Sequence, residues 1–336
     1  MVLLPALAVL SGAALLVAGA EGLVRGALGL ARRAGVSPML IGLTVVAMGT
    51  SAPELVVSVT AAALGEGDVA LGNILGSNVL NILIVLGATA AVRAVMVRQA
   101  TVRRDVPIVV AASAGVYLLA LDGRLGRIEG GILVAGAVLY LLHAYSRERP
   151  VPSAPDASAP GSVRPATRDA VEGRAGSAGR PDAPAAWLLA VLLIAGGGAL
   201  VLGGRMLVGG AITIASSLGM SERAIGLTLV AAGTSAPELA TSLVAARRGH
   251  VDLAVGNVVG SNIMNLLAVL GTTVLVSPLR IGSGPLLVDF PVMLLAAALL
   301  LPLARTGMRI GRLEGAFLLL GYAAYVTLLF LDVLPA

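Results

Sequence analysis

Long uninterrupted runs of apolar residues limit what this chain can fold into. Hydrophobic residues make up 57% of its 336 positions and charged residues 12%, whereas about a quarter of the residues in an ordinary soluble domain are charged. An apolar run of about 20 residues is long enough to cross the ~30 Å hydrocarbon core of a bilayer as a helix. We therefore expect an all-α membrane protein, because membrane strands would show alternating segments of ~10 residues instead.

Windows of this length predict about ten spans. They cover residues 3–25, 36–64, 69–92, 105–121, 127–145, 186–209, 220–246, 253–276, 286–304 and 312–331. Arginines gather in the loops after the first, third, seventh and ninth spans. Because basic loops face the cytoplasm, we expect a multi-pass protein of the cell (inner) membrane with both termini outside.

The second half of the chain repeats the first. A shift of 184 residues places VVAMGTSAPELVVS (from Val45) on LVAAGTSAPELATS (from Leu229), and GNILGSNVLNIL (from Gly72) on GNVVGSNIMNLL (from Gly256). Each copy holds five predicted spans, so the second copy enters the bilayer from the opposite side. This pattern predicts two inverted five-helix repeats, an architecture typical of secondary transporters with a substrate site between the halves.

The repeats also predict the domain organisation. Residues 1–145 form the first transmembrane repeat and residues 186–336 the second. Residues 146–185 between them are rich in Pro, Ala, Ser and Gly with mixed charge. Such a composition cannot bury a core, which predicts a disordered cytoplasmic linker.

The duplicated hexapeptide GTSAPE interrupts a span in each copy. Proline has no N–H, so Pro53 leaves the carbonyl of Gly49 without its helical partner, and Pro237 does the same to Gly233. Within hydrocarbon, broken backbone persists only where it lines a cavity or is otherwise satisfied. A cation suits the free carbonyl oxygens.

The side chains of the motif supply further oxygen atoms. Spacings of one turn bring together Thr50, Ser51 and Glu54, the equivalent Thr234, Ser235 and Glu238, and the following pairs Ser77/Asn81 and Ser261/Asn265. Hard cations such as Ca²⁺ and Na⁺ prefer oxygen ligands, whereas zinc and copper favour His or Cys. The chain has no cysteine, and its two histidines lie at predicted loop edges.

Two acidic residues in the middle of spans predict a functional site, because a membrane-buried charge is costly. If Glu54 and Glu238 meet, their repulsion requires a divalent ion, several monovalent ions or protons to neutralise them. A simpler alternative is that Ser51 and Glu54 form a capping box that restarts a kinked helix. We also expect Asp105 and Asp289 to cap the spans that they begin.

At these residues the chain resembles the sodium/calcium exchanger family of the cation/calcium exchanger superfamily. Both copies carry GTSAPE, followed by GSNVLNI in the first and GSNIMNL in the second, and the resemblance covers all ten predicted spans. It implies alternating access in which Na⁺ entry drives Ca²⁺ out, with both ions as substrates and no cofactor. The large calcium-sensing region of animal exchangers has no counterpart here.

The resemblance also implies roles for individual residues. Glu54 and Glu238 would be shared by Ca²⁺ and Na⁺, and carbonyls of Thr50 and Thr234 would complete the Ca²⁺ site. The implied outward Na⁺ site consists of Ser51, Ala231, Thr234, Ser261 and Glu238, and its inward counterpart of Ala47, Ser77, Ser235 and Glu54. Asn81 and Asn265 would flank the centre. Some relatives carry Asp at the position of Asn265, so this chain keeps two core carboxylates rather than three.

Several alternatives stay open. The hydroxyl pairs of the motif favour Na⁺ over the proton-coupled branch of the family, but Ca²⁺/H⁺ or another divalent cation/H⁺ exchange is the main alternative. An intramembrane hydrolase would need a base beside Ser51 or Ser235, and a channel would conduct faster than a carrier. We expect a transporter rather than an enzyme, with the lipid bilayer as its surroundings, no nucleic-acid partner, and a monomeric or weakly oligomeric state.

Overall fold

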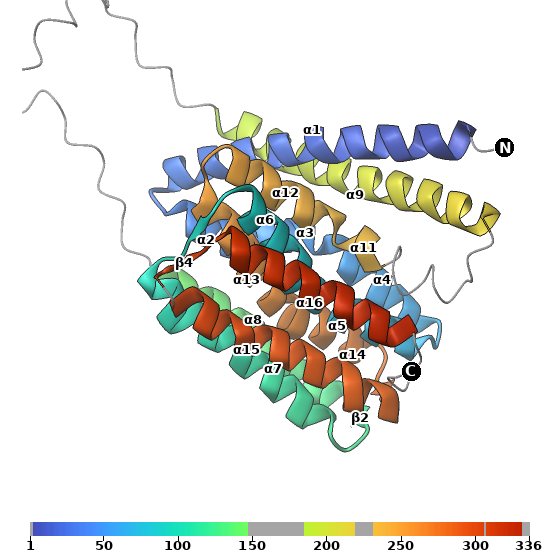
Figure 1. The fold of residues 1–336 in the computed structure, drawn as a ribbon. Coiled ribbons are helices and arrows are strands. Elements are labelled where there is room, and N and C mark those ends of the chain that lie inside the picture. Colours follow the sequence, from blue (N-terminus) through green and yellow to red (C-terminus); the bar gives the residue numbers. More distant parts are fainter. Residues whose placement is uncertain (1–2, 147–184, 219–230, 306, 331–336) are drawn as a thin grey trace, which may run out of the picture.

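The computed structural model describes residues 3–146, 185–218, 231–305 and 307–330, which form a bundle of helices (Figure 1). Nearly all of the predicted linker and the beginning of the predicted span 220–246 lie outside these residues. Within them the order of elements in the first half recurs in the second half.

The first copy contains helices, short π-helical segments (η) and two-residue strands. In chain order these are α1 (Leu3–Ala34), α2 (Pro38–Ile41), η1 (Gly42–Val46), α3 (Ala47–Thr50), α4 (Ala52–Ala63), α5 (Gly67–Leu80), η2 (Asn81–Leu86), α6 (Gly87–Val92), β1 (Val95–Met96), η3 (Thr101–Asp105), α7 (Val106–Ala120), β2 (Arg124–Leu125) and α8 (Arg127–Ser146).

The second copy follows the same plan. Its elements are α9 (Ala186–Ser217), α11 (Ala231–Thr234), α12 (Ala236–Arg247), α13 (Val251–Met264), η5 (Asn265–Val269), α14 (Leu270–Val276), β3 (Leu279–Arg280), η6 (Pro285–Asp289), α15 (Phe290–Arg305), β4 (Arg309–Ile310) and α16 (Arg312–Phe330).

The predicted spans agree with the described helices in part. By length and composition six helices can cross a membrane, or seven if the bent pair Pro38–Thr50 and Ala52–Ala63 is one span. The other predicted spans are 105–121, 220–246 and 312–331. The first and third contain α7 and α16, and the second contains α11 and nearly all of α12, which ends one residue later. The helical membrane architecture is therefore observed, while the full count of ten stays a prediction.

The first helices of the two copies, α1 and α9, lie side by side and run in opposite directions (Figure 1). Their contact depends on glycines, because a side-chain carbon at Gly12 would lie 2.7 Å from the carbonyl oxygen of Gly203, and one at Gly19 would lie 2.8 Å from that of Gly196. The 184-residue shift pairs Gly12 with Gly196 and Gly19 with Gly203. The contacts are thus reciprocal, as expected for copies of opposite orientation.

The remaining elements bind the two copies into one core. Strand β1 pairs with β4, and β2 with β3, both antiparallel, so each short strand of the first copy pairs with one of the second. Phe290 of α15 is buried and stacks on Tyr117 of α7 with ring centroids 5.4 Å apart. The two copies are therefore in contact at both strand pairs and between α7 and α15, as well as between α1 and α9.

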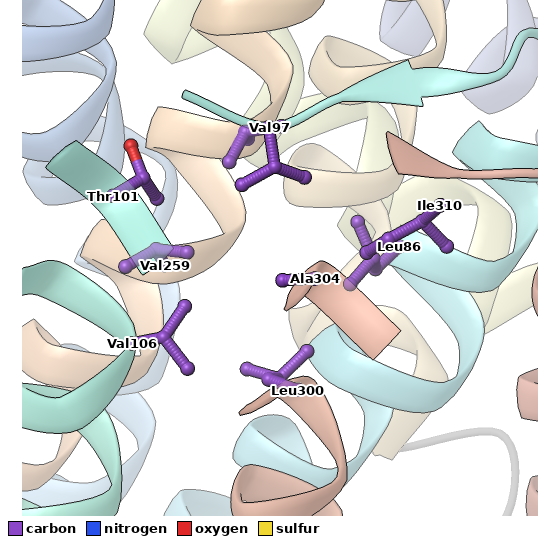
Figure 2. Close-up of a pocket in the computed structure, with 9 residues that line it drawn as sticks. Leu86, Val97, Thr101, Val106, Val259, Leu300, Ala304 and Ile310 are labelled. Carbon is purple, nitrogen blue, oxygen red and sulfur yellow. The ribbon is translucent and has the colours of Figure 1, made fainter. Parts of the chain in front are cut away.

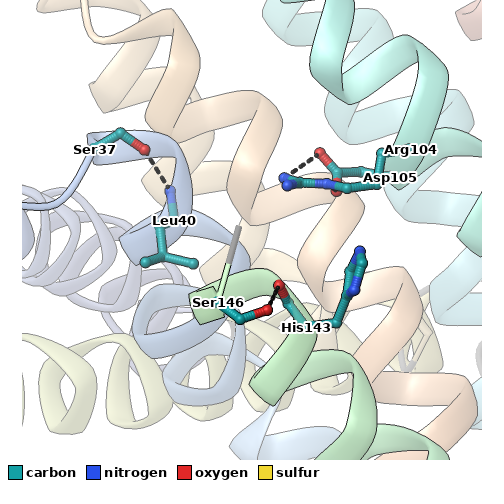
Figure 3. A network of polar contacts seen from close by, with 6 residues as sticks. All are labelled: Ser37, Leu40, Arg104, Asp105, His143 and Ser146. Atoms are coloured by element: carbon teal, nitrogen blue, oxygen red, sulfur yellow. Dashed lines mark hydrogen bonds and ion pairs between the residues drawn. The ribbon is translucent and has the colours of Figure 1, made fainter. Parts of the chain in front are cut away.

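The polar contacts at helix ends correct one expectation (Figure 3). Ser37 caps α2, since its hydroxyl accepts a hydrogen bond from the N–H of Leu40 at 3.2 Å. Asp105 was expected to cap a span, but it makes no capping bond and pairs with Arg104 at 2.7 Å. Asp289 accepts a hydrogen bond from the hydroxyl of Tyr325 at 3.2 Å. Each carboxylate therefore interacts with another side chain, Asp105 with a basic one and Asp289 with a phenolic one.

Candidate ion-binding site

Both GTSAPE segments break their helices at the serine. Ser51 separates α3 from α4 with φ −81° and ψ 5°, and the two halves of this span are bent by 43°. Ser235 separates α11 from α12 with φ −88° and ψ 4°. The prolines explain the position of the break, because each lies in the first turn of the new helix and cannot donate to the preceding turn. The carbonyl end of one short helix thus lies beside the carboxylate at the start of the next.

The side chains that were expected to bind ions are buried inside the protein. Glu54 and Glu238 are both 0% exposed. The polar residues around them are also buried, with Thr234 the most exposed at 8%: Thr50, Ser51, Ser77, Asn81, Thr234, Ser235, Ser261 and Asn265. Ala47 is buried as well, while the side chain of Ala231 is outside the described part of the chain. These candidate ligands are therefore buried in the described structure.

Each carboxylate is bound by the serine of the other repeat. The Ser51 hydroxyl donates to Oε1 of Glu238 at 3.1 Å, and the Ser235 hydroxyl donates to Oε1 of Glu54 at 3.4 Å. Neither serine makes a side-chain capping bond to the helix that it precedes. The capping-box alternative is therefore wrong, because these hydroxyls serve the opposite repeat.

Two further hydroxyl pairs join the repeats. Thr50 Oγ1 lies 3.5 Å from Ser261 Oγ, near Glu238, and Thr234 Oγ1 lies 3.4 Å from Ser77 Oγ, on the side of Glu54. Ser51 and Ser261 thus surround Glu238 as the resemblance implied. The hydroxyl of Thr234 lies in the other group, so a role for this residue beside Ser261 would require its backbone carbonyl.

Asn81 and Asn265 begin the π-helical segments η2 and η5. Both are 0% exposed, and the side-chain nitrogen and oxygen of each have no hydrogen-bond partner among the described residues. Single π-helical turns are frequent at functional sites, and buried amides that lack a partner are costly. This position suits a residue that contacts an ion or a water molecule during transport.

Two further asparagines that were not among the predicted ligands, Asn73 and Asn257, contact this cluster. Asn73 accepts a hydrogen bond from Thr234 of the other repeat at 3.1 Å, and Asn257 accepts one from Thr50 at 3.1 Å. A signal was present in the sequence, because both asparagines recur at the 184-residue shift. They also precede Ser77 and Ser261 by one helical turn, and therefore share a face with them.

The donor set fits a hard cation. It consists of two carboxylates with hydroxyl and amide side chains around them. The described residues include no group of three or more His, Cys, Asp or Glu side chains, which a transition-metal site would favour. The Oε2 atoms of Glu54 and Glu238 have no hydrogen-bond partner in the described structure. Two buried acidic groups with free oxygens require a cation or protons for neutrality.

A separate small cavity of about 20 Å³ lies between the copies (Figure 2). Its walls come from both halves and are apolar except for Thr101: Leu86, Val97, Thr101, Val106, Val255, Val259, Leu300, Ala304 and Ile310. A dry cavity of this kind offers a cation too few oxygen atoms. This cavity therefore differs in chemistry from the oxygen-rich cluster around the two glutamates.

Comparison with known proteins shows the family of this chain. The family model described as sodium/calcium exchanger protein matches residues 4–146 and 188–331. The putative antiporter CaxA of Alkalimonas amylolytica is 42% identical over 98% of this chain and 99% of its own length. The sodium/calcium exchanger MaX1 of Methanosarcina acetivorans is 30% identical over 89% of this chain and 90% of its own length. The inner membrane protein YrbG of Escherichia coli is 37% identical over 88% of this chain and 87% of its own length.

The fold is similar to solved exchanger structures. The sodium-calcium exchanger NCX_Mj soaked with Na⁺ and Sr²⁺ gives a TM-score of 0.79 at 30% identity, covering 97% of this chain and 99% of that one. The same exchanger soaked without Na⁺ and Ca²⁺ gives a TM-score of 0.80 at 29% identity, covering 98% and 100%. With the family model matching nearly the whole chain, this membrane protein belongs to the sodium/calcium exchanger family.

Proposed function

We propose that this chain exchanges Na⁺ for Ca²⁺ across the membrane by alternating access. One observation carries the proposal: two buried carboxylates from different repeats are each hydrogen-bonded by the serine of the other repeat. Both also keep an oxygen without a hydrogen-bond partner in the described structure. Their combined charge can neutralise one Ca²⁺ or more than one Na⁺.

Competition between the ions follows from the shared carboxylates. A Ca²⁺ ion held by Glu54 and Glu238 uses the charge that would otherwise bind Na⁺, so binding of either ion disfavours the other. The carbonyls of Thr50 and Thr234 complete the proposed Ca²⁺ site. The proposed Na⁺ sites use the two groups of residues that the resemblance implied, with Asn81 and Asn265 beside them. Mutually exclusive occupancy is what antiport requires.

Occlusion supports alternating access rather than a channel. The carboxylates and the hydroxyls around them are buried, so an ion reaches them only after the structure rearranges. Inverted repeats supply two equivalent rearrangements, one open to each side. In the proposed orientation both termini are outside, and residues 146–185 are cytoplasmic.

Flux measurements in proteoliposomes test the proposal. Purified protein in Na⁺-loaded vesicles is expected to take up radioactive Ca²⁺ when an outward Na⁺ gradient is present, and to stop when the gradient is collapsed. Uptake that follows a pH gradient and ignores Na⁺ would reassign the chain to Ca²⁺/H⁺ exchange. Single-channel currents would instead exclude a carrier.

A further inference from the structure

The side-chain amides of Asn73 and Asn257 are fixed by their own repeats. Asn73 Nδ2 donates to Ser58 Oγ at 2.9 Å and to the backbone carbonyl of Glu54 at 3.4 Å. Asn257 repeats both contacts, at 3.0 Å to Ser242 Oγ and 3.4 Å to the carbonyl of Glu238. A backbone carbonyl only accepts hydrogen bonds, so each amide nitrogen must face it.

This orientation leaves each asparagine oxygen toward a threonine of the other repeat. Thr50 Oγ1 lies 3.1 Å from Asn257 Oδ1, and Thr234 Oγ1 lies 3.1 Å from Asn73 Oδ1. An amide oxygen has no proton to give, so the threonine hydroxyl is the donor. The carbonyl of Ala47, 3.3 Å from the Thr50 hydroxyl, is a longer alternative that likewise only accepts.

The direction of the threonine proton determines that of its serine neighbour. Once Thr50 donates to Asn257, its oxygen is free to accept a proton from Ser261, 3.5 Å away. Thr234 stands in the same relation to Ser77 at 3.4 Å. Two chains of hydrogen bonds result, in which the serine donates to the threonine and the threonine donates to the asparagine. The serine and threonine oxygens next to the carboxylates then keep lone pairs for a cation.

We propose that Asn73 and Asn257 are positioning residues that set the direction of these two hydroxyl chains. The inference rests on the proposed cation transport. A hydroxyl beside a carboxylate has two options: it donates its proton to the carboxylate and takes up an oxygen lone pair that a cation needs, or it donates elsewhere and leaves that lone pair to the cation. The asparagine oxygen selects the second option. Without it, the hydroxyls donate to Glu238 or Glu54 and compete with the transported ion.

A double-mutant cycle in proteoliposomes tests this inference through Ca²⁺ flux. Asn257→Ala is expected to raise the half-saturating Ca²⁺ concentration about tenfold, equivalent to ~1.4 kcal/mol. In a Thr50→Val background, which lacks the hydroxyl, Asn257→Ala is expected to add less than about a twofold change. In a Thr50→Ser background, which keeps a hydroxyl, the loss of about tenfold is expected to return. Equal losses in all three backgrounds would overturn the inference, because Asn257 would then act only as a brace between α12 and α13.

Asn262→Ala is the matched control. Asn262 is also a buried asparagine of α13, but its amide nitrogen donates to the carbonyl of Val258, one turn earlier in the same helix. Its removal is expected to lower thermal stability without a tenfold change in half-saturation. An Asn262→Ala variant as impaired in Ca²⁺ affinity as Asn257→Ala would also contradict the inference.

A second measurement separates this inference from the proposed function. Ions that bind the folded protein raise its unfolding temperature, so thermal shifts of the purified variants with Ca²⁺, Na⁺ or other cations report binding without transport. If the wild-type protein shows no Na⁺-driven Ca²⁺ flux but a cation still stabilises it, the proposed function fails, and the same cycle is measured with that cation. A cation-induced shift that Asn257→Ala leaves unchanged would refute the positioning role by itself.

Discussion

Ser51 of the first repeat donates a hydrogen bond to the carboxylate of Glu238 in the second, at 3.1 Å. Ser235 and Glu54 make the reciprocal contact at 3.4 Å. Neither half of the chain therefore completes a carboxylate site by itself. A change at one motif is expected to be felt at the acidic residue of the other.

Removal of either buried charge should abolish exchange. Glu54→Gln and Glu238→Gln keep the size of the side chain but leave a divalent ion half-neutralised, and loss of one partner of a buried charge pair costs about 3–5 kcal/mol. We expect Na⁺-driven Ca²⁺ flux to fall by more than about 100-fold. Glu129→Gln is the control, because Glu129 lies at a helix start and accepts a hydrogen bond from the N–H of Gly126. Flux near the wild-type level in either core variant would contradict the site.

The contact between Ser51 and Glu238 predicts that Ser51 variants lose Ca²⁺ affinity even when the new residue is a good helix cap. Ser51→Ala removes a hydrogen bond that stabilises the ionised Glu238 through Oε1 and leaves Oε2 to the ion. Such a bond to a charged group is worth about 1.5–3 kcal/mol, so we expect Ca²⁺ affinity to fall at least tenfold. Ser51→Asn introduces a favourable capping residue in place of the hydroxyl. If Ser51 acted mainly as a cap, the Asn variant would transport like the wild type. We expect it to stay impaired, as measured by half-saturation in vesicles.

The α1–α9 contact predicts opposite effects for two glycines of the same helix. A side-chain carbon at Gly203 would lie 2.8 Å from both the carbonyl oxygen of Gly12 and the backbone nitrogen of Leu16, whereas one at Gly198 meets nothing within 4 Å. Gly203→Ala should therefore force the helices apart and destabilise the protein by about 1–3 kcal/mol. Gly198→Ala should be neutral or stabilising by up to ~1 kcal/mol. Thermal unfolding in detergent compares the two, and equal unfolding temperatures would contradict the close packing.

An ion pair breaks the symmetry between the copies. Arg248, directly after α12, pairs with Glu21 of α1, which also pairs with Arg25. The 184-residue shift places Arg205 at the position of Glu21 and Leu64 at that of Arg248, so the mirrored arrangement lacks this contact. Partly exposed pairs contribute about 0.2–1 kcal/mol. Glu21→Gln should therefore shift the balance between the two access states by up to about fivefold.

The chain has no native cysteine, so a single introduced cysteine can report this balance through its rate of labelling from one side of the membrane. The double exchange of Glu21→Arg with Arg248→Glu should restore the wild-type rate. High salt should weaken the effect of Glu21→Gln. A shift that persists in the double exchange would show that the ion pair is not its cause.

The sequence predicted the class of fold and the core of the site for physical reasons that act locally. Apolar runs indicate membrane helices because the bilayer fixes their length. The proline of GTSAPE predicts the break before Glu54 because a missing N–H acts on the adjacent turn. The number of spans is harder to predict from local patterns. The break leaves Pro38–Thr50 and Ala52–Ala63 as two helices bent by 43°, which count as one span only if they cross the membrane together.

The partners of polar side chains were harder to predict. Ser51 fitted a capping box as well as a ligand, and the two interpretations could not be separated from spacing alone. Asn73 and Asn257 recur in both copies and share a helix face with Ser77 and Ser261, but this pattern does not say which residues of the other repeat lie opposite them. The hydroxyl of Thr234 lies with Ser77 rather than Ser261 for the same reason, because its position depends on the packing of the other repeat.

The amino-acid sequence by itself determined the membrane class, the duplication and the oxygen chemistry of the donors, since these depend on composition and on neighbours within one or two helical turns. Only the tertiary structure decided which donor faces which carboxylate. The contact between Ser51 and Glu238 joins residues 187 positions apart, and a hydrogen bond forms only within about 3.5 Å and near-linear geometry. That geometry exists only when the two copies pack against each other, and no local pattern encodes it.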